Sequence, residues 1–493
     1  MQDLSPTGFR KNCGKIIDWY DARKPIYSNF DFIDRFFDSE HTVRRIFSLA
    51  RKLDLCSFLV ESIDSNNEIV QEDDNLLRQC NCDFTNSQIW RVSFFTSEKD
   101  KRPALDNFLG YAVIRKEFFE NRRHNLFIYE SVLKPYRHEL HNNFIHCKRT
   151  YKVAYPFGIF DVTGVLYAQQ NGLSFVCAHV ALRSVLSLLL PEGDISYSEI
   201  NQLAGFTQYP TPGLSTHEIT QILAKKNIIS KEESPASLEK TKKISFYSSL
   251  YGNIESGCPS LLAFKTTNSA HVVPVIGHTF NEDTWVSDAG KFYFGLNEYY
   301  SSECWLSTYI IHDDNFGPYL CIPRNFIEKD NFLHLWGLNQ CKDALCFEKT
   351  ELVALEILNS FIDLNPILYI SWYDRLVHFV KNKQIVLRSI FISRKQYIGD
   401  LQNHWFEENI LNRFKKLPEY FWMVEISCPE LFSSTRAKFG EILLTCNKVD
   451  MNFAGTAKPL AFRLPGVVYF EGDTLPTRTC IETYTRLHSG IIN

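Results

Sequence analysis

Two short segments roughly ninety residues apart constrain this chain most. From Cys177 to Leu190 the chain is almost wholly apolar, and Pro191 then ends the run, which predicts a buried helix with the cysteine in its first turn. From His271 to Ile276 β-branched residues predominate, which is typical of a buried strand. A second helical pattern lies near Thr216–Lys226, and strand patterns are expected only from about Ile244. This order of elements predicts that the region carrying both segments has a helical half followed by a β half.

The position of Cys177 favours a catalytic role over a purely structural role in the core. A thiol in the first turn of a helix lies near free backbone N–H groups and the positive end of the helix dipole, which favour the nucleophilic thiolate. Free cysteines are among the most buried residue types, and with 14 cysteines in the chain most must be inert. The interpretation of Cys177 as a nucleophile therefore depends on a base elsewhere in the sequence.

His271 supplies that base. Asn281-Glu282-Asp283 contains turn residues, and Thr284-Trp285-Val286 can start a returning strand, so the pattern predicts a hairpin over 271–288. Asp288 would then lie beside His271 and fix its tautomer, as the third member of a triad does. Asp283 is the alternative, and either aspartate could instead be a plain turn or strand-end residue.

A glutamine just before the cysteine completes the set of candidate catalytic residues. Gln170 lies seven positions before Cys177, and a side-chain amide there could donate a hydrogen bond to a developing oxyanion. Gln169 and Asn171 are open alternatives.

In this order the residues resemble the papain-like cysteine peptidase superfamily, in particular its bacteriocin-processing (double-glycine) peptidase and phytochelatin synthase branches. Gly257-Cys258-Pro259 matches the Gly-x-Pro strand that precedes the histidine hairpin in those families, and the likeness covers roughly residues 155–325. It implies a cleft between a helical half carrying Cys177 and a β half carrying His271 and Asp288. The chain departs from the family pattern at Gln170, since relatives commonly place the glutamine six positions before the cysteine, and at Ala178, where they often have Gly or Trp.

The rest of the chain predicts two further domains. At about 150 residues per domain, 493 residues suggest an N-terminal α/β domain over 1–150 of unknown role, the papain-like domain over 151–328 and a C-terminal α/β accessory domain over 329–493. The third region has a helical pattern at 351–358 and strand patterns at 385–392 and 420–426. No Gly/Ser-rich linker separates the parts, so we expect them to pack on one another. The stretch from Lys231 to Pro235 is the clearest expected exposed loop.

Composition excludes several functional classes. A formal net charge of −4 offers no basic field for nucleic acid. No run of 18 apolar residues and no signal peptide is evident, so we expect no membrane partner and a cytoplasmic protein with free cysteines. Two clusters could suggest a metal: Cys80 and Cys82 near Cys56, and His138, His141, His146 and Cys147. Neither has zinc-site spacing, so we interpret both as solvated polar loops and expect no metal and no cofactor.

These observations predict a cytoplasmic papain-like thiol protease or amidase. It would act on a peptide or protein substrate through Cys177, His271, Asp288 and Gln170 and form a thioester intermediate. Transpeptidation or deamidation by the same residues is the first alternative. A catalytically inactive binding or scaffold module is the second. The sequence does not indicate an oligomeric state.

Overall fold

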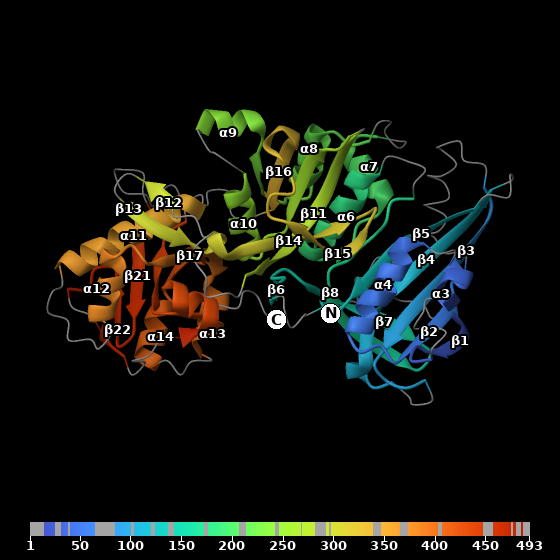
Figure 1. Ribbon diagram of the computed structural model, residues 1–493, viewed down its shortest axis with the longest axis horizontal. Coiled ribbons are helices and arrows are strands. Elements are labelled where there is room, and N and C mark those ends of the chain that lie inside the picture. The colour runs from blue at the N-terminus through green and yellow to red at the C-terminus, as the bar shows by residue number, and fades with distance from the viewer. Residues whose placement is uncertain are drawn as a thin grey trace.

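The computed structural model contains three packed parts along an elongated molecule (Figure 1). It mixes helices and strands throughout, as predicted, and no helix among the described residues is long and apolar enough to cross a membrane. The structure describes residues 14–24, 31–37, 40–64, 84–99, 103–119, 124–136, 142–171, 176–206, 213–241, 246–267, 269–281, 292–294, 297–338, 347–364, 373–402, 407–446, 457–474, 477–479 and 485–486.

The N-terminal part is an antiparallel sheet of five strands in sequence order. These are β1 (Lys15–Asp21), β2 (Ser57–Ser62), β3 (Phe84–Phe95), β4 (Phe108–Phe119) and β5 (His124–Leu133). Helices α3 (Asp31–Phe37) and α4 (His41–Lys52) cover one face, and the hairpin of β7 (Arg149–Tyr155) and β8 (Gly158–Gly164) covers the other. Successive side chains of a strand point to opposite faces, so Phe58 packs under α4 while Leu59 packs under the hairpin. The expected domain boundary at 150/151 falls inside this hairpin.

The middle part is a second, largely antiparallel sheet. Its strands run in the order β15 (Gly317–Pro323), β14 (Leu306–Asp313), β11 (Ala270–Phe280), β10 (Ser260–Lys265), β16 (Phe332–Leu338) and β9 (Ser230–Glu233), and β6 (Asn142–Phe144) pairs with the end of β11. Helices α6 (Cys177–Leu189), α7 (Tyr197–Ala204) and α8 (Thr216–Lys225) pack on one face. Helix α10 (Tyr247–Glu255) packs on the other. The predicted helix from Cys177 is confirmed.

Local sequence explains where these helices begin and end. The Ser196 side chain accepts the N–H of Glu199 at the start of α7, and Gly205 ends that helix with φ of 88°, a left-handed conformation that glycine adopts without strain. Ser215 and Glu218 form a reciprocal capping box at the start of α8. The exposed loop expected at 231–235 is wrong, because Lys231 to Glu233 belong to β9, an edge strand held by backbone pairing with β16.

The C-terminal part is a third sheet that takes in residues from the middle of the chain. Its order is β12 (Phe292–Phe294), β13 (Asn297–Ser301), β17 (Val386–Ser393), β18 (Tyr420–Ser427), β20 (Gly440–Leu444), β21 (Pro459–Leu464), β22 (Val467–Phe470) and β23 (Thr477–Arg478). The predicted strands at 385–392 and 420–426 are confirmed as β17 and β18, and the predicted helix at 351–358 lies within α11 (Phe347–Leu364). Since β13 pairs in parallel with β17, the sheet crosses the expected boundary at 328/329.

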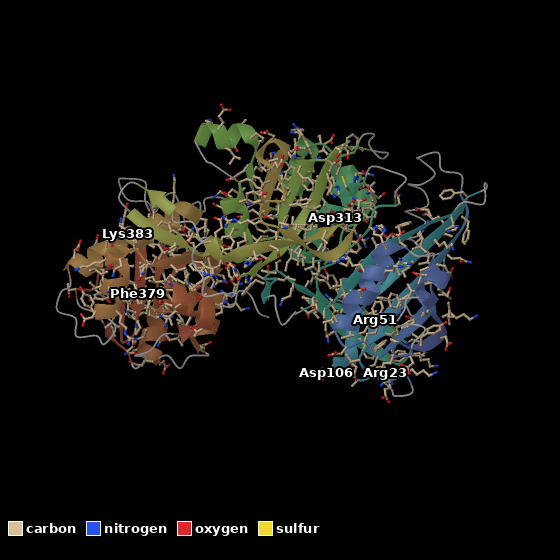
Figure 2. The ribbon with its side chains drawn as sticks, viewed as in Figure 1. Arg23, Arg51, Asp106, Asp313, Phe379 and Lys383 are labelled. Atoms are coloured by element: carbon tan, nitrogen blue, oxygen red, sulfur yellow. The ribbon has the colours of Figure 1, made fainter. Side chains whose placement is uncertain are left out.

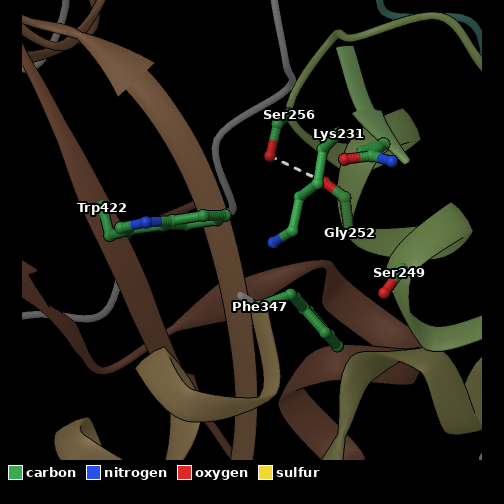
Figure 3. A pocket seen from close by; sticks show the side chains of 7 residues that line it. Lys231, Ser249, Gly252, Ser256, Phe347 and Trp422 are labelled. Carbon is green, nitrogen blue, oxygen red and sulfur yellow. Dashed lines mark hydrogen bonds between the residues drawn. The ribbon is translucent and has the colours of Figure 1, made fainter. Parts of the chain in front are cut away.

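The three parts share cores, as the absence of linkers predicted. Ile276 and Ile310 of the middle sheet pack among buried residues of the N-terminal part. Leu250 of α10 belongs to the same core as Val386 and Val424 of the C-terminal sheet. A narrow crevice remains at this second junction, with Lys231, Ser249 and Phe347 around it and Trp422 of β18 facing them (Figure 3).

Candidate active site

Cys177 is the first residue of α6 and is half-buried. The preceding residue, Val176, caps the helix without any side-chain hydrogen bond, and the first turn contains no acidic residue. The first backbone N–H groups of a helix have no partner within the helix. The thiol therefore lies beside donors that favour negative charge on sulfur or on a bound oxygen.

His271 lies near the start of β11, where it meets the thiol. Its Nε2 forms a hydrogen bond with Asp313, and the Cys177 side chain is close enough to raise the pKa of the ring. Phe264, its partner on β10, meets the ring edge-on at a centroid distance of 5.5 Å. The structure thus brings together the two residues on which the sequence prediction depended most.

Two carboxylates lie on one side of the imidazole. Its Nε2 is 3.3 Å from Asp313 Oδ2 and 3.4 Å from Asp314 Oδ1. Asp313 ends β14, which runs antiparallel to β11, so the end of one strand meets the start of the other. In Figure 2 Asp313 lies on the side of the middle part that faces the N-terminal part. Because Nε2 faces Asp313 and Asp314, Nδ1 is the ring nitrogen that can accept the proton of the Cys177 thiol.

Only the first arm of the predicted hairpin over 271–288 is described, as β11, and its returning arm lies outside the described residues. One edge of β11 pairs with β10 and β6, and the other pairs with β14. Asp288 and the alternative Asp283 lie outside the described residues. In the sequence, the strand Leu306–Asp313 followed directly by Asp314 was the feature that could have indicated an aspartate beside His271.

The two aspartates differ in their protonation. Burial acts to raise the pKa of Asp313, but hydrogen bonds from His271 and from the N–H groups of Asn315 and Phe316 lower it below its ordinary value. Burial raises the pKa of Asp314 to about 7, with the charge of Asp313 adding to the effect and that of His271 opposing it. Asp313 is therefore the permanent anion of the pair at neutral pH.

The two aspartates also raise the pKa of His271. Burial alone would lower its pKa, but the hydrogen bond with Asp313, the nearby Cys177 side chain and the negative charges of both aspartates raise that pKa to about 10. At neutral pH the ring is therefore an imidazolium, which can pair with a neighbouring thiolate.

Among the three candidate amides before the cysteine, Gln170 is connected to this group through Asn315. Its Nε2 donates to Asn315 Oδ1 at 2.6 Å, and Asn315 Nδ2 in turn donates to Asp314. The side-chain oxygen of Gln169 instead accepts hydrogen bonds from Thr42 and from the backbone of Ile128, which fastens it to the N-terminal part. The backbone oxygen of Asn171 accepts from Asn125. Gln169 therefore has a structural role here.

The N-terminal part supports the loop that carries the acids. Arg45 of α4 donates to the backbone oxygens of Pro318 and Tyr319. The Tyr319 hydroxyl donates to Leu133 of β5 and accepts the N–H of Val165. The sequence assigned no role to this part, and in the structure it positions the turn that follows Asp313 and Asp314.

Two groups of side chains among the described residues have the composition of metal ligands. One is His271 with Asp313 and Asp314, and the other is His146 with Glu255 and His278. The interpretation of His146 as part of a solvated loop is wrong, because the residue is 3% exposed. Cys80, Cys82, His138 and His141 lie outside the described residues. In the first group the Cys177 thiol also acts on His271, which is typical of a thiol site rather than of a metal site.

Comparison with known proteins gave no relative: no family model, no curated protein and no solved structure matches the chain.

Proposed function

We propose that this chain is a papain-like cysteine hydrolase that acts on peptide or other amide bonds. One observation carries the proposal: a cysteine at the head of a helix raises the pKa of a histidine whose Nε2 lies 3.3 Å from a buried aspartate, in the order of a catalytic triad. The resemblance of residues 155–325 to papain-like peptidases supports the same proposal. Asp313 takes the role that the sequence suggested for Asp288.

In this proposal Cys177 attacks as a thiolate paired with the His271 imidazolium. The sulfur adds to the substrate carbonyl, and the N–H of Cys177 and the amide of Gln170 bind the oxyanion. For this the Gln170 amide must exchange its bond to Asn315 for one to the substrate. His271 then gives its proton to the leaving amine, and a thioester to Cys177 remains.

The second half of the reaction uses the same groups in reverse. His271, now neutral, takes a proton from water, and the resulting hydroxide attacks the thioester and releases the acid. Asp313 stabilises the imidazolium in both halves and keeps the ring oriented. An amine acceptor in place of water gives transpeptidation, and a side-chain amide as substrate gives deamidation.

Product analysis with a peptide library tests the proposal. Purified protein should generate new termini, ligated peptides or a deamidated side chain, and Cys177→Ala should generate none of them. Mass spectrometry distinguishes the three outcomes by product length, since hydrolysis shortens the peptide, ligation lengthens it and deamidation leaves its length unchanged. In H₂¹⁸O the label enters the new carboxylate in the first and third cases only. Equal products from the wild type and from Cys177→Ala would refute the assignment of the nucleophile.

A further inference from the structure

A second group of ionisable side chains meets in the core, away from Cys177. His146 follows β6, Glu255 is the last residue of α10, and His278 lies in β11, seven residues beyond His271. All three are buried, with exposures of 3%, 0% and 0% in that order. One nitrogen from each histidine and one oxygen from the glutamate lie within 4.8 Å of one another.

The two histidines meet the glutamate at the same carboxylate oxygen. The Nε2 atom of His278 contacts Glu255 Oε1, and His146 Nε2 lies 3.8 Å from the same oxygen. Phe144 packs against both imidazoles, with centroid distances of 6.0 and 5.1 Å. Protein side chains therefore hold both rings with their Nε2 atoms turned toward one carboxylate.

Hydrogen bonds account for the pairing of His278 and Arg388 with Glu255 but not for the position of His146. His146 Nε2 is buried and has no hydrogen-bond partner, and 3.8 Å is too long for a hydrogen bond to the carboxylate. A buried polar atom without a partner is destabilising. A ligand that accepts the lone pair of His146 would remove that penalty.

Arg388 orients the carboxylate from the other side. Its Nε donates to Glu255 Oε2 at 2.6 Å, which leaves Oε1 for the two histidines. Arg388 also donates to Glu425, whose other oxygen accepts from Lys438. A carboxylate fixed by such an outer partner is a recurring feature of metal sites.

We propose that His146, Glu255 and His278 bind a divalent transition-metal ion, with zinc the preferred ion. Two imidazoles and a carboxylate are a zinc donor set, and water can take the fourth tetrahedral position. His278 would coordinate as the tautomer protonated at Nδ1. The ion would tie the segment after β6 to α10 and β11 at the place where Arg388 joins the C-terminal sheet, so its role is structural.

Metal analysis of the purified full-length chain tests this site. Without chelators, the wild type should contain one equivalent of zinc by plasma mass spectrometry, and His146→Gln and His278→Gln should lose it. His312→Gln is the matched control, since His312 is also buried with an unpartnered Nε2 but lies outside the group. His271→Ala should keep the zinc, and loss of zinc in that variant instead would place the ion at the other group and overturn the proposal.

A wild-type measurement keeps the test independent of how well the variants fold. Stripped protein should bind one equivalent of Co²⁺, with the visible absorption of a tetrahedral ion, and added zinc should displace the cobalt and raise the thermal midpoint. A wild-type chain that is purified without metal and that binds neither ion would refute the site. None of these readouts depends on hydrolase activity.

Discussion

Asp313 accepts a hydrogen bond from His271 at 3.3 Å across 42 residues of chain, because the end of β14 lies beside the start of β11. Its other oxygen is held by the N–H groups of Asn315 and Phe316. The carboxylate is thus oriented before any substrate arrives, which is what a triad acid needs.

Replacing Asp313 by Asn should reduce kcat by about 10²–10⁴-fold, since an amide neither stabilises the imidazolium nor holds the same tautomer. Steady-state kinetics on a peptide found in the library screen measures the change. Asp288→Asn is the comparison variant and should retain activity. The opposite ranking, with Asp288 essential and Asp313 silent, would contradict the assignment.

Gln170→Ala should lower kcat by about 10²–10³-fold, the usual effect of removing one oxyanion donor. Gln169→Ala provides the matched control, because its side chain bonds Thr42 and Ile128 and its loss should lower thermal stability more than turnover. If Gln170→Ala has full activity and Gln169→Ala or Asn171→Ala does not, the wrong amide has been chosen.

Asp314 should make the protein less stable as pH rises from about 4 to about 7. Its folded pKa of about 7 lies above its ordinary value, so the folded state binds the more protons in this window and stability falls with pH. Asp314→Asn should remove this slope and raise the free energy of unfolding at pH 8 by at most about 4 kcal/mol. Urea unfolding at several pH values measures it, and an unchanged slope would show that Asp314 is ionised throughout.

Arg183 of α6 should be essential for stability. It is buried and donates to Asp194 and to Glu130 of β5, so Arg183→Leu removes a cation that two buried carboxylates share and should cost about 3–5 kcal/mol. Arg413→Leu is the control, because its pair with Asp473 is partly exposed and should contribute about 0–1 kcal/mol. Equal effects of the two variants would contradict this account of α6.

The helix that starts at Cys177 and the strand that carries His271 could be predicted because each is a single unbroken run of mostly buried residues in the sequence. Apolar runs with a proline stop or a β-branched pattern specify such elements without knowledge of the rest of the fold. The strands β17 and β18 were predictable for the same reason.

The contact of Asp313 with His271 could not be predicted in this way. Which strand pairs with β11 is decided by tertiary register, and the structure selects β14. Similarly, the polar stretch at Lys231 becomes an edge strand through backbone pairing with β16. His146 is buried by partners from α10 and β11 that are distant in sequence.

The most direct test of the central claim is the alkylation of the intact folded protein by iodoacetamide at pH 6, followed by peptide mapping. Burial raises the pKa of Cys147, Cys258 and Cys304 to about 12 and that of Cys428 to about 11, so these thiols should stay unmodified. Cys177, beside the His271 imidazolium and the first N–H groups of α6, should react ahead of every other cysteine, and His271→Ala should abolish that preference. Faster labelling of another cysteine, or labelling of Cys177 that is unchanged in His271→Ala, would contradict the account.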